Sequence, residues 1–405
     1  MDTFDAIDPH ALARDAAAAV RVPSVTGSER AVMEHLAAAA AALGLDAELH
    51  EHDLAALRRH PGHPGEEAPR DELVGVTVTL PGGRPGRLCV NGHVDVVETG
   101  TVPWRHGPWS GALEDGRLHG RGSVDMKGSV VAALHALAAL HATGAAAEAP
   151  TVTLQLVASE EDGGLGTFAA LERDAAFDAC LIPEPTGFDV VCAQAGALTF
   201  SGVVPGRAAH AAHRLAGTSA IDRYVPIHLA LQAHERAVNA GVAHPLMREL
   251  ELPYPLVVGR VEAGAWSSSV PDRLAFEGRL GVPVGESPGA ARAALERVVR
   301  EAGGDDVEIA WTGGAFAPAE TDPAHPWVAL VRRALADERG SPPRVTGVPW
   351  GADMRLFAAR GIPVTMVGPP AIGLAHAVDE SVRVDDLVTV ARMLVRVVLA
   401  WRPPP

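Results

Sequence analysis

Residues 87–97 have the sequence RLCVNGHVDVV, an apolar strand pattern that ends in His and Asp. Residues 128–144, GSVVAALHALAALHATG, have the length and apolar character of a buried helix that glycine ends. Residues 151–164, TVTLQLVASEEDGG, are again an apolar strand followed by acidic residues. Strand, helix and strand in this order predict a βαβ unit with parallel strands. Open α/β sheets bind ligands at the carboxyl ends of their strands, which is where this segment places its polar residues.

The same alternation continues on both sides of this segment. Before and just after it we predict helices at 9–20 and 28–43 and strands at 73–80 and 178–182. Near the end of the chain we predict helices at 326–339 and 384–401 and a strand at 362–367. The expected fold class is therefore α/β, with a mostly parallel central sheet flanked by helices.

The pattern changes at about residue 195. Here we predict four strands and two helices, namely strands at 198–204, 256–262, 273–282 and 306–311 and helices at 219–238 and 288–302. This combination indicates a compact α+β domain inserted into the first one. The expected organisation is a first domain made of residues 1–194 and 315–405, with the inserted domain at 195–314.

Composition excludes several classes of function. The chain of 405 residues has 34 basic and 50 acidic residues and a formal charge of −16, which argues against a nucleic-acid partner or a membrane-surface role. Its apolar stretches are shorter than the roughly 20 residues of a membrane span. The acidic N-terminus does not resemble a signal peptide. Three cysteines do not make a disulfide framework, so we expect a cytoplasmic protein.

Histidines and carboxylates gather at the predicted strand ends. Each has an ordinary alternative when taken alone, because a strand-end His is commonly structural and an acidic turn is commonly solvated. Together they form a nitrogen and oxygen ligand set suited to zinc, with cobalt or manganese as possible substitutes. The residues at these ends are His93, Asp95, Asp125, Glu160, Glu161, Glu184 and His376, and the two histidines with three or four of the carboxylates would serve as ligands.

A pair of bridged metal ions accounts for this inventory. Two ions roughly 3.5–4 Å apart need one shared carboxylate and further ligands for each ion. Asp125 can bridge, which leaves His93, His376, Glu161 and Glu184 to divide between the two ions. Asp95 is placed to orient the His93 imidazole, and Glu160 is a spare carboxylate suited to act as general base.

The arrangement resembles the dinuclear zinc peptidases and deacylases typified by acetylornithine deacetylase, succinyl-diaminopimelate desuccinylase, aminoacylase and glutamate carboxypeptidase. The resemblance covers nearly the whole chain. It rests on six segments in order: VPSVTGSE (22–29), GHVDVV (92–97), GRGSVDMKG (120–128), SEEDGG (159–164), PEPT (183–186) and AHAVDE (375–380). The family implies that His93 and Glu184 hold one zinc ion and that Glu161 and His376 hold the other, with Asp125 between them. Glu160 would then deprotonate the bridging water and pass the proton to the leaving amine.

The resemblance also implies a role for the inserted domain, as a lid that forms the homodimer. His210, in GRAAHAAHR (206–214), would reach the partner subunit's site and bind the carbonyl oxygen, whereas His213 would be structural. Arg279 would bind the substrate carboxylate, its alternative being a surface ion pair. The segment WSSSVP (266–271) departs from many relatives, which have an asparagine before Val-Pro.

The sequence therefore predicts a cytoplasmic, homodimeric, two-zinc amide hydrolase acting on small N-acyl amino acids or related amides. A metal-dependent dipeptidase or carboxypeptidase is the alternative, because it needs the same site. A non-hydrolytic or biosynthetic metal-binding relative is a further alternative. We expect the only lysine, Lys127, to form an ion pair within its loop, and Trp350 and Arg355 to line the pocket.

Overall fold

The computed structural model describes residues 2–369 and 372–403, which form two compact units. The first unit contains residues up to 192, residues 321–346 and the chain from 356 onward. The second contains residues 193–320 and 347–355. None of the described helices is long and apolar enough to cross a membrane.

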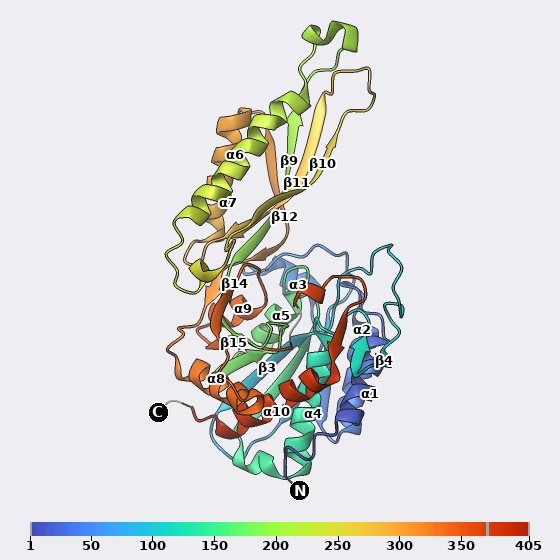
Figure 1. Cartoon of the computed structure of the whole chain (residues 1–405), viewed down its shortest axis with the longest axis vertical. Helices are drawn as coiled ribbons and strands as arrows, with labels where there is room; N and C mark the ends of the chain where they lie inside the picture. Colours follow the sequence, from blue (N-terminus) through green and yellow to red (C-terminus); the bar gives the residue numbers. More distant parts are fainter. Residues whose placement is uncertain (1, 370–371, 404–405) are drawn as a thin grey trace. The chain divides into compact units, whose positions relative to one another are not determined.

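The first unit is built on a mixed sheet (Figure 1). Its four middle strands, in spatial order β6, β3, β7 and β15, run parallel, which confirms the predicted parallel centre. The strands on either side of these four pair in antiparallel fashion. The bounds are β1 (Asp46–Glu51), β2 (Val74–Leu80), β6 (Thr151–Val157), β3 (Arg87–His93), β7 (Ala179–Ile182), β15 (Val364–Met366) and β8 (Val190–Gln194). The last two residues of β8 belong to the second unit, where short β13 (Ala319–Glu320) pairs with them, and β14 (Val345–Val348) also pairs with β8.

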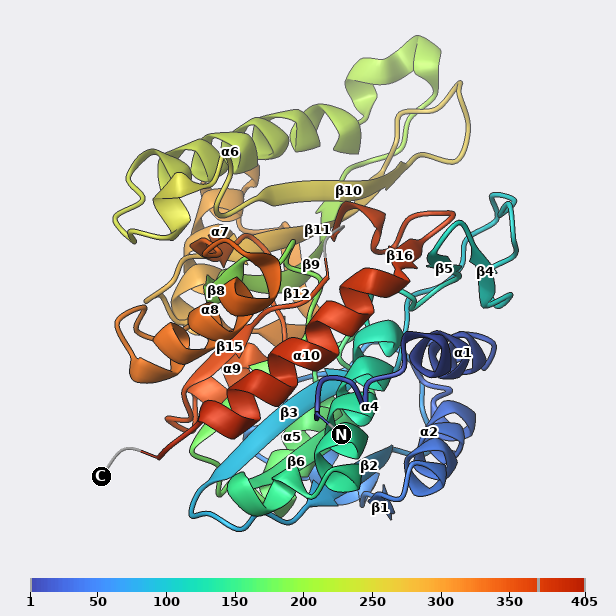
Figure 2. The same cartoon turned by 60° about the horizontal axis from the view of Figure 1, so that its bottom comes forward.

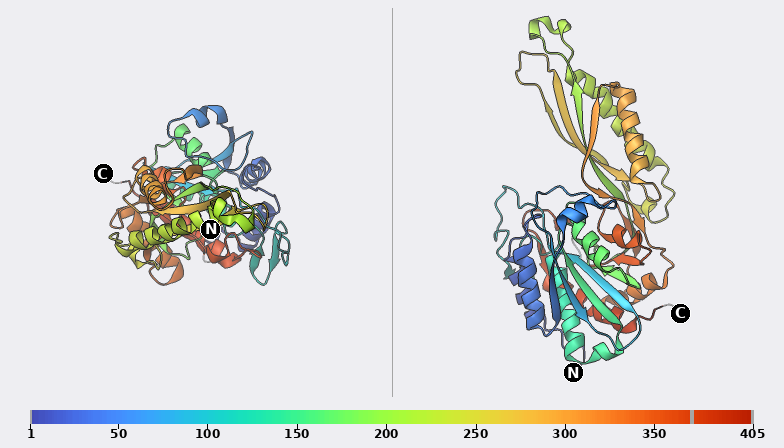
Figure 3. Two further views of the ribbon diagram at one scale, coloured as in Figure 1. Left: turned by 90° about the horizontal axis from the view of Figure 1, so that it is seen from above. Right: turned by 180° about the vertical axis from the view of Figure 1, so that it is seen from behind.

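Helices cover both faces of this sheet. Four of them pack side by side in one layer (Figure 2), namely α1 (Pro9–Val20), α4 (Lys127–Ala142), α8 (Pro326–Arg339) and α10 (Val384–Ala400). Helix α5 (Leu165–Arg173) packs on β6 and β2 from the other face (Figure 3). This follows from right-handed crossovers, because β3–α4–β6 and β6–α5–β7 move in opposite directions across the sheet. The other described α-helices of the first unit are α2 (Arg30–Ala42) and α3 (Leu54–Arg59). Helix α9 (Met354–Ala358) begins in the second unit and ends in the first.

A small three-stranded sheet completes the first unit. Its spatial order is β16 (Ser381–Arg383), β5 (Arg117–His119) and β4 (Ala112–Glu114), all antiparallel. Strand β16 belongs to the segment that follows β15, and β5 leads into the glycine-rich loop before α4. The small sheet therefore joins two loops that are distant in the sequence.

The second unit is an α+β domain, as predicted. Its sheet has the antiparallel order β10 (Leu256–Ala263), β11 (Arg273–Val282), β9 (Gly196–Pro205) and β12 (Glu308–Phe316). Helices α6 (Ala220–Ala240) and α7 (Pro288–Gly303) pack against each other and against the sheet. Phe200, Phe276 and Leu295 are buried between these layers, where aromatic rings fill much of the core.

His52, which follows β1, allows a test of the fold by pH. Burial, with added repulsion from His50 and Arg173, lowers the pKa of His52 to about 4, from a usual value of 6.5. Between these pH values the unfolded chain binds a proton that the folded chain does not, so acidification destabilises the fold. We expect His52→Gln to reduce the stability lost between about pH 7 and pH 5 by about 1 kcal/mol, a figure discounted for partial exposure.

The measurement is chemical unfolding of chelator-treated protein at several pH values, compared with His141→Gln. His141 is an exposed residue, so its replacement controls for the loss of one imidazole. Parallel pH profiles for wild type and His52→Gln would contradict a neutral, buried His52.

Candidate metal centre

The candidate site lies at the carboxyl ends of the parallel strands. His93 ends β3, Glu160 and Glu161 follow β6, and Glu184 follows β7. The chain leaves β3 toward α4 on one face and leaves β6 toward α5 on the other. Adjacent strands whose connections diverge in this way leave a crevice at their ends, which is where open α/β sheets bind ligands. The topology therefore brings these polar residues together.

Two further residues reach the crevice from loops. Asp125 precedes α4, and His376 lies in the segment between β15 and β16. Asp125 directs one carboxylate oxygen toward each of two imidazoles. Its Oδ1 is 2.9 Å from His93 Nε2, and its Oδ2 is 3.5 Å from His376 Nε2. A carboxylate shared between two imidazoles is the arrangement expected of a ligand that bridges two ions.

The remaining carboxylates divide between the two imidazoles. Glu161 lies 3.1 Å from His376 Nε2, and Glu184 lies 3.7 Å from His93 Nε2. His93, Asp125 and Glu161 alone already place their ligand atoms close enough to hold a metal ion. The structure thus brings together the five residues that the sequence singled out as a ligand set.

Asp95 connects both sides of the site. Its main-chain carbonyl lies 2.9 Å from His93 Nδ1, while its carboxylate lies farther from that nitrogen, at 3.6 Å. The carboxylate instead accepts hydrogen bonds from the backbone N–H groups of Glu160 and Glu161, at 3.1 and 3.2 Å. Asp95 therefore orients the imidazole mainly through its carbonyl and holds the acidic turn through its side chain, a division that sequence reasoning did not predict.

The electrostatic surroundings favour positive charge at both imidazoles. Burial alone would lower the pKa of His93, but Asp125, Asp95 and Glu184 outweigh it and raise that pKa well above its usual value. Asp125 and Glu161 raise the pKa of His376 to about 10. Burial, with repulsion from Asp125, raises the pKa of Glu161. A site that attracts a proton in this way also suits a divalent cation, and imidazole with carboxylate is a donor set that zinc prefers.

Arg121 and Glu380 hold the two loops of the site in place. The buried pair has an Nη1–Oε2 distance of 2.7 Å, and a second guanidinium nitrogen donates to the carbonyl of His376. Glu380 Oε1 accepts from the backbone N–H of Asp125 at 3.2 Å. Both residues lie within the motifs GRGSVDMKG (120–128) and AHAVDE (375–380), but no role was predicted for either. The available signal was one charged residue in each of the two segments that supply Asp125 and His376. The sequence does not show that these two charged residues pair.

We expect Glu380→Gln to weaken metal binding at both halves of the site by about 10–100-fold, because loss of a supporting carboxylate lets the ligands reorient. The measurement is zinc competition against a coloured chelator. Asp385→Asn, which changes an exposed carboxylate near Arg383, is the matched control. Equal affinities for wild type and Glu380→Gln would show that the Arg121 pair does not support the ligands.

A second buried ion cluster holds the acidic turn that contains Glu160. Arg70 contacts Asp162 at 3.2 Å and Glu29 at 3.3 Å, and all three side chains are buried. Asp162 also accepts hydrogen bonds from Ser159 and from the backbone N–H of Ala68. The acidic turn is therefore anchored on both sides, by Asp95 and by Asp162.

The other residues singled out from the sequence lie as follows. In the second unit, His210 is exposed at the start of a short 3-10 segment, and its Nδ1 accepts from the backbone N–H of Ala212 at 3.1 Å. Arg279, also exposed, lies on β11 and forms no ion pair with any residue that the structure describes, unlike the surface pair that was its alternative. Trp350 is half-buried, whereas Arg355 is buried, donates to the Ala352 carbonyl and lies over the Phe316 ring.

The ion pair expected for Lys127 is absent among residues 2–369 and 372–403. Its ammonium donates instead to the carbonyl of Val22 at 3.1 Å and lies 5.2 Å from the centre of the Trp109 ring. Burial lowers the pKa of Lys127 to about 7. The prediction was wrong because the loop turns this side chain into the core rather than toward an acidic neighbour.

Comparisons with known proteins agree with this geometry. The chain is 31% identical over 392 residues to a succinyl-diaminopimelate desuccinylase of Gluconacetobacter diazotrophicus, covering 93% of this chain and 92% of that one. An M20 family metallo-carboxypeptidase from Sulfolobus solfataricus has the same fold, with a TM-score of 0.75, 16% identity and coverage of 98% and 99%.

A dinuclear metal-binding peptidase of the M20 family, YXEP from Bacillus subtilis, also shares the fold. Its TM-score is 0.64 at 15% identity, with coverage of 96% of this chain and 97% of that one. The model of peptidase family M20/M25/M40 matches residues 89–400. This match spans most of the chain and contains the whole candidate ligand set, so the chain belongs to peptidase family M20/M25/M40.

Proposed function

We propose that this chain is a two-metal amide hydrolase that removes the acyl group from small N-acyl amino acids. The observation that carries the proposal is Asp125, which directs one oxygen toward His93 and the other toward His376. Two cations held in this way supply Lewis-acid polarisation of a substrate carbonyl and lower the pKa of a nucleophilic water. His93 and Glu184 would hold one ion, and His376 and Glu161 the other, with Asp125 shared.

Glu160 acts as general base and then as general acid in this proposal. It is buried beside Glu161 after β6, and its backbone N–H is held by Asp95, which fixes the residue next to the candidate ligands. It accepts a proton from the attacking water and delivers that proton to the nitrogen of the leaving amine. Asp95 contacts both this turn and the His93 imidazole, which links the base to one of the candidate ligands.

We propose zinc as the metal, with cobalt or manganese as functional substitutes. The donor set of two imidazoles and three carboxylates supports this choice, because no cysteine is present among the ligands and the site is not an all-oxygen cage. YXEP, a structural neighbour, is described as binding two metal ions, which supports a pair here.

The proposed substrate is an N-acyl amino acid with a free carboxylate near the scissile amide. The desuccinylase relatives support an acyl group such as succinyl. Arg279 supports the carboxylate, because its exposed guanidinium has no ion-pair partner among the described residues and suits bidentate recognition. A dipeptidase or carboxypeptidase is the second candidate. A probable carboxypeptidase of Aspergillus niger, 26% identical over 389 residues, favours it.

The experiment measures amine release from N-succinyl and N-acetyl amino acids, matched analogues without the carboxylate, and dipeptides. The protein is stripped with chelator and then reloaded with zinc. Zinc-restored release from the acyl amino acids supports the deacylase, and release confined to dipeptides supports the second candidate. No release from either class, with both ions of this centre bound, would contradict amide hydrolysis of these substrates.

We further propose a cytoplasmic homodimer in which the second unit is a lid and supplies His210 to the partner's site. Apolar side chains support an interface on this unit, because Val225 and Leu229 on α6 and Val257 and Val261 on β10 are each at least half exposed. Strand β10 also ends its sheet, so its outer edge has no partner strand in the described chain. Exposed apolar groups beside an open strand edge are typical of interaction surfaces.

Mixing two inactive variants tests the role of His210. We expect His210→Ala and Glu160→Ala to be inactive alone and to recover roughly a quarter of wild-type activity after subunit exchange, because half of the dimers are mixed and each has one intact site. Amine release is measured after mixing, and exchange is shown separately with tagged subunits. His213→Ala is the matched control. Exchange without recovery would contradict a shared site.

A further inference from the structure

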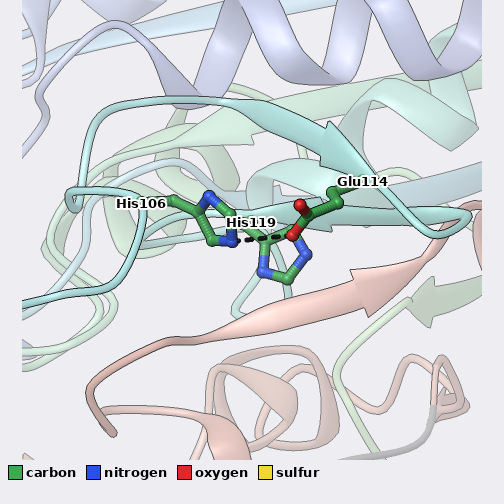
Figure 4. Close-up of side chains that lie close together, drawn as sticks. All are labelled: His106, Glu114 and His119. Carbon is green, nitrogen blue, oxygen red and sulfur yellow. Dashed lines mark ion pairs between the residues drawn. The ribbon is translucent and has the colours of Figure 1, made fainter.

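A second cluster of possible metal ligands lies on the small sheet of the first unit, apart from the candidate metal centre. His106, Glu114 and His119 each place one ligand atom within 4.8 Å of the other two (Figure 4). His106 Nε2 lies 3.1 Å from Glu114 Oε2, and the two imidazole ring centres are 4.5 Å apart. None of these residues belongs to the ligand set described above. The proposed hydrolase function therefore leaves this cluster unexplained.

The hairpin of β4 and β5 explains why two of the ligands meet. Its turn, residues 115–116, has positive φ at both positions, which fixes a tight two-residue connection and hence the register. Ala112 is opposite His119, and Glu114 is opposite Arg117. Because side chains alternate between faces, Glu114 and His119 share one face as diagonal neighbours. Ala112 has only a methyl group at the position beside them, so Glu114 can reach across.

The loop before the hairpin holds the third ligand in place. Arg105 donates its backbone N–H to Asp379 Oδ1 at 2.7 Å. Trp104 donates from its indole nitrogen to the carbonyl of Thr99 at 3.1 Å. His106 therefore follows two anchored residues, and Figure 4 shows its ring directed toward Glu114. A ligand set positioned by an anchored loop and a paired hairpin is largely preorganised.

An ordinary hydrogen bond does not account for the contact between His106 and Glu114. His106 Nε2 is buried, yet it forms no hydrogen bond with any residue that the structure describes, although a carboxylate oxygen is 3.1 Å away. A buried nitrogen that faces a carboxylate oxygen at this distance without forming a hydrogen bond calls for a specific explanation. Arg105 also contacts Glu114, at 3.1 Å, but its side chain is 69% exposed, and such pairs contribute little.

The spacing suits a small divalent ion. Ligand atoms around tetrahedral zinc are roughly 3.3 Å apart, given metal–ligand distances of about 2.0–2.1 Å. The His106–Glu114 distance of 3.1 Å is already close to that value. The upper limit of 4.8 Å within the cluster leaves only a small side-chain rotation to complete the set. Two histidines and one carboxylate with an open fourth position form a ligand set typical of zinc and related transition metals.

We propose that His106, Glu114 and His119 bind a third divalent transition-metal ion. The ion would tie the loop before β4 to the hairpin. Strand β5 leads directly into the loop of Asp125, and the Arg105 backbone is bonded to Asp379, three residues after His376. The third ion is therefore placed to brace both loops of the candidate metal centre without contacting substrate.

Metal counting tests the proposal. Chelator-stripped protein is titrated with zinc, and bound metal is measured after removal of free ions. We expect three ions for wild type and for His141→Asn, which removes an exposed imidazole elsewhere, and two ions for His106→Asn and for His119→Asn. The third ion should bind at least about tenfold more weakly in either variant.

An Asp125→Asn background separates this site from the proposed hydrolytic centre. One ion should remain bound there, and adding His119→Asn should remove it. Cobalt absorption reports the change directly, because a three-ligand site with water has bands of its own. Retention of two ions by His106→Asn and His119→Asn shows that these proteins fold. A metal count that both variants leave equal to wild type, whatever its value, would overturn the proposal.

Discussion

Glu160→Gln is expected to lower kcat by about 10³-fold, within the range of about 10²–10⁴ for loss of a general acid–base group. The amide cannot accept a proton from water, while the imidazoles and carboxylates of the ligand set are unchanged. Both ions should therefore remain bound, and KM should change little. A group that acts only in the transition state lowers kcat and kcat/KM together. The measurement is steady-state amine release with bound metal counted on the same sample.

Glu172→Gln is the matched control, because Glu172 is a partly exposed carboxylate on α5 paired with Arg360. It should retain wild-type kinetics. Activity of Glu160→Gln within about tenfold of wild type would contradict the assignment of the base. Loss of metal together with activity would instead place Glu160 among the ligands.

Asp125→Ala is expected to remove both ions and to lower kcat/KM by at least about 10³-fold, because metal-ion catalysis supplies several kcal/mol of transition-state stabilisation. Because Asp125 faces both imidazoles, its loss should affect both ions, unlike the loss of a residue beside one imidazole. Glu184→Gln, which changes a carboxylate 3.7 Å from His93 Nε2, should weaken only one ion. Isothermal titration with zinc distinguishes the two patterns, since Asp125→Ala loses both binding steps of this centre and Glu184→Gln loses one of them.

Zinc titration of Asp125→Ala also shows whether the protein is folded. The expected outcome is loss of both steps with an unchanged far-ultraviolet circular dichroism spectrum. Two unchanged binding steps would contradict a bridging role for Asp125. A single lost step would assign Asp125 to one ion only.

The central elements and the grouping of the candidate ligands could be predicted because their signal is local. Strand β6 is predicted at 151–158 and observed at Thr151–Val157, and α4 is predicted at 128–143 and observed at Lys127–Ala142. Both are apolar enough to be buried on all sides, which gives a pattern that a sequence shows clearly. The ligands come directly after such strands, so their convergence follows from parallel topology.

Other features depend on contacts that no local pattern contains. Strand β1, with the sequence DAELHE, is mostly exposed and carries charges, so its pairing with β2 is what makes it a strand. The pair of Arg121 with Glu380 joins residues far apart in the chain. Asp95 uses its main-chain carbonyl toward His93, and no residue type predicts a backbone contact. The inward turn of Lys127 is likewise set by tertiary packing around Trp109.

The positions of the two imidazoles in the sequence have a consequence for how a newly made chain would acquire its metal. His93 and His376 come from parts of the first unit that precede and follow the entire second unit. A pair of ions that shares Asp125 and uses both imidazoles would therefore bind only a chain in which the segments before and after the second unit have come together. Ligands that bind the folded state alone shift folding by mass action. Metal binding at this site would thus add stability to a chain whose first unit has already assembled, besides its effect on how fast product forms.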